Sequence, residues 1–324
     1  MRRLMFWLLF LALLFSGYWF AAAKGAQEGL RQALEQIRRD GWQVETGAMG
    51  VTGFPGQFSL DITGLSVAAP DGFWAWNGPD LQLAAPSIKP TQLSLSLPET
   101  QTLRIGGQNI EIAATTLQLN AATRMNMAAS FDAASVLMED ALLRSDQGWD
   151  MQLASGDVAL TAVEEEAQTY GLDVAIADLV LPADLVRQIG LSDQISSLTT
   201  DAQLSFDRPL DRFALEGTPP AVTTLDLRSL NVVWGDITLG AAGLLDIDAQ
   251  GIPEGQIIFE TAEWRRLIDL LVDTGAVDAG NAATVRTMAG AMAGSDGVLQ
   301  LPLTFRDGFM SMGLLPLGPA PVLR

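Results

Sequence analysis

From Trp42 onward, apolar residues alternate with small polar ones at a period of two. Successive side chains of a β-strand point to opposite faces, so this alternation predicts strands with one apolar and one mildly polar face. Proline, glycine and asparagine separate the segments at short intervals, which favours pairing between chain neighbours. The clearest segments in the first half are DLQLAA (80–85), TQLSLSL (91–97), QNIEIAA (108–114), TLQLNA (116–121) and DMQLAS (150–155). The sequence therefore predicts a mainly β (α+β) protein built on an elongated, twisted antiparallel sheet.

The second half repeats this alternation, but helical patterns interrupt it. The strand-like segments are 198–206, 223–234, 236–249, 255–260 and 297–305. PADLVRQIG predicts a helix near 182–190, because proline favours the first turn of a helix and glycine its end. TAEWRRLIDLLVDTG places apolar residues at i, i+3, i+4 and i+7 and predicts a helix near 261–275, and a weaker pattern predicts one near 279–293. We expect a first β lobe over 42–170 and a second over 171–324.

One eight-residue pattern occurs twice in the chain, as LDITGLSV (60–67) and LDLRSLNV (225–232). Each copy is followed by tryptophan and then by a segment that reads Asp, aliphatic, polar, Leu. The corresponding pairs are Trp76 with Trp234 and residues 80–83 with 236–239. An internal duplication of a strand–turn–strand unit explains the match, and the alternative is chance recurrence of a simple β pattern. The sequence leaves open whether the two lobes share one sheet or form separate domains.

The amino terminus carries a long apolar run. Residues 4–23 contain no charge, and as a helix of about 30 Å they match the hydrocarbon core of a bilayer. We therefore expect residues 1–23 to form a transmembrane helix that acts as a signal anchor, followed by a helical stalk over 24–41. The alternative is a cleaved signal peptide, since residues 21–23 are small. The bulky aromatic residues at 18–20 argue against cleavage and suit an interfacial belt.

Basic residues flank both ends of this apolar run, so their count gives almost no preference for orientation. A three-residue head that leads directly into an apolar run is typical of a signal anchor whose head stays in the cytoplasm. The sequence thus predicts a single-pass inner-membrane protein with the bulk of the chain in the periplasm of a Gram-negative host.

Composition excludes several classes of function. The chain has no histidine and no cysteine, which removes Ser–His and Cys–His nucleophiles, His- or Cys-ligated zinc, iron–sulfur clusters and disulfides. Its 38 acidic and 19 basic residues leave a net charge of −19, so no nucleic-acid partner is expected. The carboxylate pair Asp246 and Asp248 and the acidic run 164–166 read as solvated surface. We expect no enzymatic activity, no cofactor and no metal site.

The apolar face of the first-half strands is the best candidate for a binding surface. Few helices are predicted there to cover it, so the sheet either closes on itself as a sandwich or barrel or leaves an open groove for lipid or a partner. The candidate groove residues are Leu81, Leu83, Leu93, Leu95, Leu97, Leu117 and Leu119. Trp74 and Trp76 share one strand face and are candidate interfacial or carbohydrate-stacking aromatics, although a core or turn-packing role is the favoured interpretation because aromatic side chains are usually buried.

Three segments carry a resemblance to a known family: GVTGFPGQFSLDITGLSVAAP (50–70), LNVVWGDITLGAAGLLDIDAQGIPEGQIIF (230–259) and LQLPLTFRDGFMSMGLLPLGPAP (299–321). Together they resemble an uncharacterised bacterial family, number 2125 among the domains of unknown function, over almost the whole chain. The anchor, short helix and GFP-type strand pairs are similar, more distantly, to AsmA-like envelope proteins. The second resemblance implies a twisted, groove-forming sheet and lipid handling between envelope membranes, whereas the first supports location and architecture more than function.

These inferences combine into an expected function. We expect a membrane-anchored periplasmic protein that binds lipid or another apolar ligand in a groove of its sheet, in cell-envelope lipid handling. Its expected partners are the inner membrane and either phospholipid or an envelope protein. The alternative is a non-catalytic envelope scaffold or interaction module with a closed β core, which binds other proteins through exposed strand edges.

Overall fold

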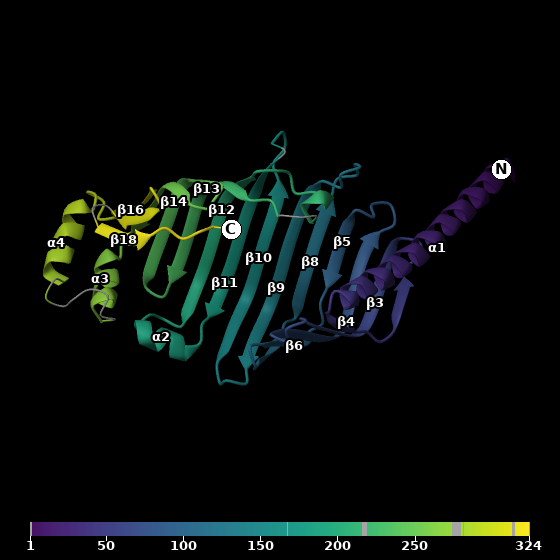
Figure 1. The fold of residues 1–324 in the computed structure, drawn as a ribbon, viewed down its shortest axis with the longest axis horizontal. Coiled ribbons are helices and arrows are strands. Elements are labelled where there is room, and N and C mark those ends of the chain that lie inside the picture. Colours follow the sequence, from purple (N-terminus) through teal and green to yellow (C-terminus); the bar gives the residue numbers. More distant parts are fainter. Residues whose placement is uncertain are drawn as a thin grey trace. The chain divides into compact units, whose positions relative to one another are not determined.

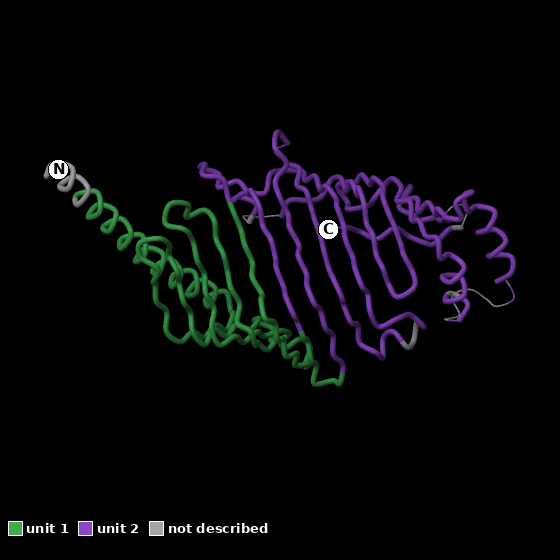
Figure 2. The backbone as a smooth tube through the Cα atoms, turned by 180° about the vertical axis from the view of Figure 1, so that it is seen from behind, with its two compact units in different colours: residues 1–122, 142–148 green, residues 123–141, 149–324 purple. Residues whose placement is uncertain are grey.

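The computed structural model describes residues 2–166, 168–215, 219–273, 280, 282–312 and 315–323, with the side chains of residues 2–9, 187–189, 215, 271 and 315 outside that description. The described strands, β1 to β18, belong to one antiparallel sheet (Figure 1). This confirms the predicted mainly β class. The chain divides into two compact units, which we call unit 1 (1–122 and 142–148) and unit 2 (123–141 and 149–324) (Figure 2). The expected lobe boundary between residues 170 and 171 falls instead inside a strand, β11.

Unit 1 combines helix α1 with strands of unequal length, of which β3 and β4 are the longest that lie wholly within it. Its strands are β1 (Gln43–Glu45), β2 (Met49–Thr52), β3 (Gln57–Ala68), β4 (Trp74–Pro86), β5 (Gln92–Ser96), β6 (Thr100–Ile105), β7 (Gln108–Ala113), β8 (Thr116–Thr123) and the end of β9 (Phe131–Ser145). β3 pairs with β1, β2 and β4, and β4 pairs in turn with β6 over 74–77 and with β5 over 82–84. β5 pairs with β8, and β7 pairs with β6 and β9. Every one of these pairs is antiparallel.

Helix α1 (Arg2–Arg39) is one continuous helix of 38 residues, so the expected anchor and stalk are parts of a single element. Its carboxyl-terminal half lies against unit 1, where Gln27 Nε2 donates to the carbonyl of Met49 at 3.1 Å and Arg38 Nε donates to that of Val44 at 2.8 Å. Its amino-terminal end extends beyond the strands (Figure 1). Gly41, at φ +94°, supplies the left-handed residue that ends the helix.

None of the helices, within the residues that the structure describes, is long and apolar enough to cross a membrane. The expected transmembrane span begins at residue 4, and the side chains of residues 4–9 lie outside the described part of the chain. Trp19, expected at a membrane interface, is instead 3% exposed and stacks on Phe58 of β3. The interfacial-belt interpretation is therefore wrong for Trp19, because protein side chains surround it.

Unit 2 is a meander, in which consecutive strands pair with one another. Its strands are the start of β9, β10 (Asp150–Ala162), β11 (Thr169–Val180), β12 (Gln194–Phe206), β13 (Val222–Trp234), β14 (Ile237–Ile247), β15 (Pro253–Thr261), β16 (Leu299–Arg306), β17 (Phe309–Met312) and β18 (Leu315–Pro319). From β10 to β18, each strand pairs antiparallel with the next along the chain. Cross-strand rows such as Leu160, Leu172, Ala202 and Leu227 gather apolar side chains on one face.

The helices of unit 2 lie where helical patterns interrupt the alternation. They are α2 (Ala183–Ile189), the 3₁₀ helix η1 (Arg212–Leu215), α3 (Trp264–Asp273) and α4 (Ala282–Met292). α2, α3 and α4 fall within the predicted segments, of which residues 274–279 and 281 lie outside the described chain. Trp264, Ile268, Ala289 and Leu299 form a buried cluster that packs α3 and α4 against β16.

The repeated eight-residue pattern occupies equivalent strands in two hairpins. Residues 60–67 lie in β3, which pairs with β4, and residues 225–232 lie in β13, which pairs with β14. However, Trp76 lies on the second strand of its hairpin, whereas Trp234 ends the first strand of the other. The turns explain this difference, because residues 69–73 separate β3 from β4 while two residues separate β13 from β14. The hairpin recurs, but the two tryptophans are not structurally equivalent.

Candidate apolar binding site

An apolar cavity of about 270 Å³ lies between α1 and the strands of unit 1. α1 contributes Tyr18, Ala22, Ala26 and Leu30 to its lining. The strands and the segment after β4 contribute Val51, Phe58, Leu60, Leu83, Ala84, Ala85, Pro90 and Leu93. None of these side chains is charged. Since ligand pockets span roughly 300–1,000 Å³, this cavity has room for a slender apolar group rather than a bulky one.

Trp19 and its aromatic neighbours fasten α1 to the sheet beside this cavity. The Trp19 ring stacks on Phe58 with 5.4 Å between centroids and 16° between planes, and it meets Phe54 edge-on at 5.4 Å. Its Nε1 donates to the carbonyl of Gln57 at 3.1 Å, so the buried indole N–H is satisfied. This docking fixes the distance between the helix and β3.

Two alanines keep the cavity open on the helix side. Tyr18, Ala22, Ala26 and Leu30 recur every fourth residue and therefore lie along one side of α1. Between the larger residues at either end, Ala22 and Ala26 each present a single methyl group to the space above the sheet. From the sequence, the alanines at 21–23 indicated only a cleavage site, so this role was missed.

All seven leucines of the expected groove lie on one face of the unit 1 sheet. Leu83 is opposite Leu95, which is opposite Leu119, and directly opposed residues share a face. Leu81, Leu93 and Leu117 each lie two residues along a strand from one of these three leucines and therefore share their face. Leu97 joins the same face beside Leu117, whose carbonyl accepts the Leu97 amide at 2.9 Å. Leu83 and the 43% exposed Leu93 line the cavity. The predicted leucine face is thus contiguous with it.

The opposite face of the same strands is polar and internally bonded. One cross-strand row there contains Asp61, Gln82, Ser96 and Gln118. Gln82 Nε2 donates to Asp61 Oδ1 at 2.7 Å, and Gln118 Nε2 donates to Ser94 Oγ at 2.6 Å. Because its polar groups pair with one another, this face needs no cover, and the leucine face is the one that does.

Trp74 and Trp76 belong to the polar side of β4 and not to the leucine face. Both are half-buried. The rings of Trp42 and Trp74 meet at 5.3 Å between centroids with 66° between planes, and Trp76 Nε1 donates to Gln101 Oε1. Their positions on β4, an odd number of residues from Leu81 and Leu83, place them opposite those leucines. Both tryptophans therefore make packing contacts within unit 1.

Two more cavities lie where β4 exchanges one partner strand for another. Residues 78–81 of β4 have no cross-strand partner on β5 or β6, which pair with 82–84 and 74–77. A cavity of about 590 Å³ opens there, lined by Leu81 and Leu97 among others. A neighbouring polar cavity of about 510 Å³ shares Pro79 and Thr100 with it and extends to Glu111 and Arg144. Sequence patterns gave no indication of Glu111 or Arg144, because strands β7 and β9 that carry them are far apart in the chain.

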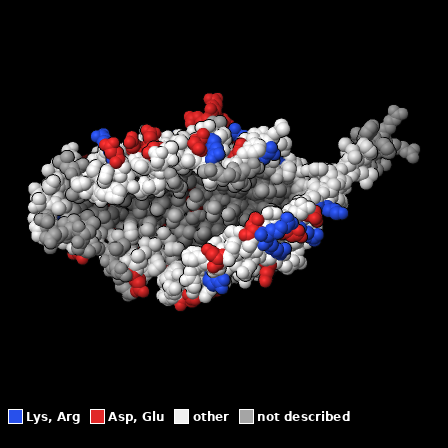
Figure 3. Space-filling model, viewed as in Figure 1, with Lys and Arg blue, Asp and Glu red and all other residues white. Residues whose placement is uncertain are grey.

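The charged side chains of α1 that the structure describes gather on its carboxyl-terminal half, and residues 10–23 of the helix carry no charge (Figure 3). They pair within the helix, with Arg31 and Glu28 at 3.9 Å and Arg39 and Glu35 at 3.7 Å. Such exposed pairs at i, i+3 and i, i+4 contribute little to stability. The charged carboxyl-terminal half of α1 thus follows an uncharged apolar segment.

The carboxylates singled out in the sequence have structural positions in unit 2. Asp248 Oδ1 accepts the amides of Gln250 and Ile252, each at 2.8 Å, and so shapes the turn between β14 and β15. Asp246 lies on β14 within 3.4 Å of Thr224 Oγ1. In the described part of the chain, no group of three or more acidic side chains is arranged to hold a metal ion.

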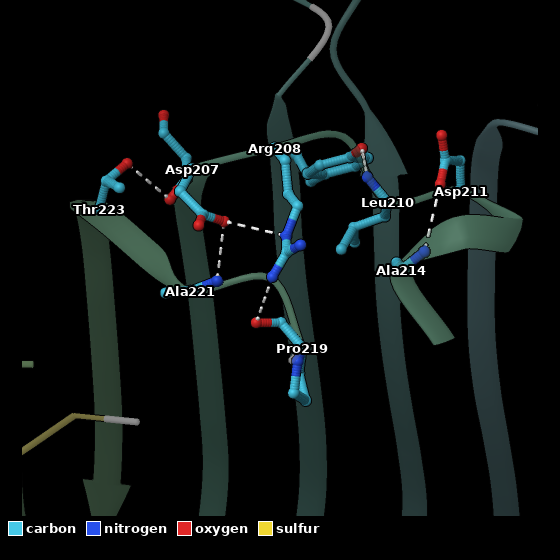
Figure 4. Close-up of polar contacts among 10 residues, drawn as sticks. Asp207, Arg208, Leu210, Asp211, Ala214, Pro219, Ala221 and Thr223 are labelled. Carbon is cyan, nitrogen blue, oxygen red and sulfur yellow. Dashed lines mark hydrogen bonds and ion pairs between the residues drawn. The ribbon is translucent and has the colours of Figure 1, made fainter. Parts of the chain in front are cut away.

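The connection from β12 to β13 holds another polar cluster of unit 2 (Figure 4). Asp207 Oδ1 accepts the amide of Ala221 at 2.9 Å and lies 3.7 Å from Arg208 Nε, while Arg208 Nη2 donates to the carbonyl of Pro219 at 3.2 Å. Such mutual bonds hold a loop in place, and its charged groups are already occupied by contacts within the loop. We therefore assign this cluster a structural role.

Comparisons with known proteins place the chain in a family. The model of a family described as an uncharacterized protein conserved in bacteria, DUF2125, matches residues 19–321. Neither the curated proteins nor the solved structures include a match. These comparisons give no support to the more distant AsmA-like similarity. The match covers nearly the whole chain and confirms the first resemblance, so this protein belongs to the DUF2125 family of bacterial proteins.

Proposed function

We propose that this protein is a membrane-anchored protein of the periplasm that binds a lipid acyl chain between α1 and the leucine face of unit 1. It would thereby act in lipid handling within the cell envelope. The observation that carries the proposal is the cavity beneath Ala22 and Ala26, whose lining is uncharged and apolar apart from the Tyr18 hydroxyl. Burying apolar surface stabilises by roughly 25 cal/mol per Å², so a cavity of this kind favours hydrocarbon over water.

The amino-terminal half of α1 supports the anchor in this proposal. Leu13 is 72% exposed, and Phe10, Leu11 and Leu14 are also exposed on the segment that extends beyond the strands. An exposed run of large apolar residues is unfavourable in water and is typical of contact with lipid. The cavity begins at Tyr18 on the same helix, so an acyl chain that leaves a bilayer along α1 would meet it directly.

The test is lipid retention by the full chain, expressed in a Gram-negative host, extracted in mild detergent and measured by native mass spectrometry. We expect bound phospholipid in the unaltered protein and about tenfold weaker retention in Ala22→Leu. Each displaced methylene contact is worth about 0.8 kcal/mol, and two of them correspond to roughly one order of magnitude in affinity. Ala26→Leu, on the same side of α1, serves as the second variant.

Ala21→Leu is the matched control, because it makes the same change at an exposed position of α1 outside the cavity lining. It should retain lipid like the unaltered chain. Lipid-free protein, or equal retention in the Ala21 and Ala22 variants, would contradict the proposal. Stable protein partners in place of lipid would then favour an envelope scaffold.

A further inference from the structure

The leucine face of unit 1 becomes polar at one end, in the cavity of about 510 Å³. Asn77, Thr102, Glu111 and Arg144 form one cross-strand row over β4, β6, β7 and β9. Asn77 lies an even number of residues from Leu81 and Leu83 on β4, so this row and the leucines share a face. From Leu83 to Asn77 the strand covers about 20 Å, at roughly 3.3 Å per residue. One bilayer leaflet holds about 15 Å of hydrocarbon, so this face has the length of an acyl chain plus a headgroup.

The two charged residues of this row face each other without pairing. Glu111 is directly opposite Arg144, yet within the described residues the Arg144 guanidinium forms no ion pair or hydrogen bond, and neither does the Glu111 carboxylate. Asp146, the other acid of this cavity, already accepts Asn109 Nδ2 at 2.8 Å and the Asn109 amide at 3.1 Å. One cation and one anion are thus available side by side, as a ligand with both signs of charge requires.

Resting on the proposed function, we propose that this polar end selects lipids with a phosphoethanolamine headgroup. Arg144 would bind the phosphate, since guanidinium groups suit phosphate oxygens, and Glu111 would bind the primary ammonium. The cavity lining includes no aromatic side chain, whereas quaternary ammonium groups are bound by aromatic cages, so choline is disfavoured. Glu99 lines the adjoining cavity, and Asp61 and Asp80 border it from the other face of the same strands, so three carboxylates near this end repel a headgroup of net negative charge such as phosphoglycerol.

The test offers the full chain in detergent an equimolar mixture of phosphatidylethanolamine, phosphatidylcholine and phosphatidylglycerol and reads bound lipids by native mass spectrometry. We expect phosphatidylethanolamine to exceed each competitor by about threefold, a modest ratio because both charged residues are exposed. Glu111→Gln should abolish the preference over phosphatidylcholine, because only the ammonium contact distinguishes these two lipids, and Arg144→Gln should lower retention of all three lipids. Arg306→Gln, an exposed arginine of unit 2 outside this cavity, should change neither the ratio nor the total.

The outcomes separate this inference from the function on which it rests. Lipid that binds in the mixture ratio, or a preference over phosphatidylcholine that survives Glu111→Gln and Arg144→Gln, would overturn headgroup selection and leave acyl-chain binding in place. Absence of any bound lipid would overturn the proposed function itself. If Arg306→Gln also lost the preference for phosphatidylethanolamine, that preference would depend on net charge, and recognition of the headgroup by Glu111 and Arg144 would be overturned.

Discussion

Gly243 on β14 illustrates how closely two strand backbones approach in unit 2. A Cβ built at this residue would overlap the carbonyl oxygen of Gln256 and the Cα of Ile257. Both are backbone atoms of β15, which pairs with β14 on both sides of this point, so they cannot move without disturbing the ladder. Glycine is required here by space and not by an unusual φ.

Gly243→Ala should therefore lower the free energy of unfolding by about 1–3 kcal/mol, the usual cost of overpacking. Gly171→Ala on β11 is the control, because its nearest neighbour atom, the Thr161 carbonyl oxygen, is at an ordinary 3.9 Å. Denaturant titration of both variants measures the difference. A Gly243 variant as stable as the Gly171 variant would show that β14 and β15 can separate locally.

At the scale of elements, α1 is the part of the fold whose position matters most for the candidate site. Trp19 contributes the stacked ring, the edge contact and the indole hydrogen bond that join it to β3 and its preceding loop. A helix without these contacts would stand free of the sheet, and the cavity would lose one side. The cavity therefore forms only when α1 packs against the strands, and neither the helix nor the strands alone would provide it.

Trp19→Ala should cost about 3–5 kcal/mol of docking free energy, the range for deletion of a buried aromatic side chain. We expect protease cleavage within residues 24–39 of the detergent-solubilised full chain to accelerate as α1 separates from the sheet. Leu13→Ala removes an exposed apolar side chain from the same helix and should leave the cleavage rate unchanged. Equal cleavage rates in the two variants would mean that α1 is held by other contacts.

The elements that local periodicity defines were the predictable part of this fold. The alternation from Trp42 onward indicated most strands, and the apolar spacing in 261–275 indicated α3, because both signals lie within a few consecutive residues. The leucine set also followed from alternation alone, since residues two apart share a strand face. Ala22, Glu111 and Arg144 were not predictable, because their roles depend on helix docking and on the register of strands far apart in sequence.

At the scale of the whole molecule, the net charge of −19 acts on every anionic lipid that approaches. This long-range repulsion is screened by salt, whereas a headgroup contact at Glu111 and Arg144 acts over a distance shorter than the screening length and is screened less. Raising ionic strength from about 0.02 M to 0.15 M shortens the screening length from roughly 20 Å to 8 Å. The two contributions to lipid selection can thus be separated by salt.

We expect retention of phosphatidylglycerol by the full chain to rise over this salt range, while phosphatidylethanolamine, which carries no net charge, changes little. The lipid mixture and mass readout described above measure both at once. A phosphatidylglycerol signal that does not respond to salt would show that the acidic surface plays no part in discrimination. The ratio that remains at high salt reports the local headgroup contacts.

The strand-to-next-strand pairing from β10 to β18 also has a consequence for how the chain acquires its structure. Each new strand needs only the edge left by the one before it, so unit 2 contains many pairings between residues close in sequence, and such local contacts form fast. During synthesis the amino terminus of the chain appears first, so β11 can pair with β10, and β12 with β11, before the carboxyl terminus has been made. The meander is therefore suited to folding while the chain is still being synthesised, one hairpin at a time.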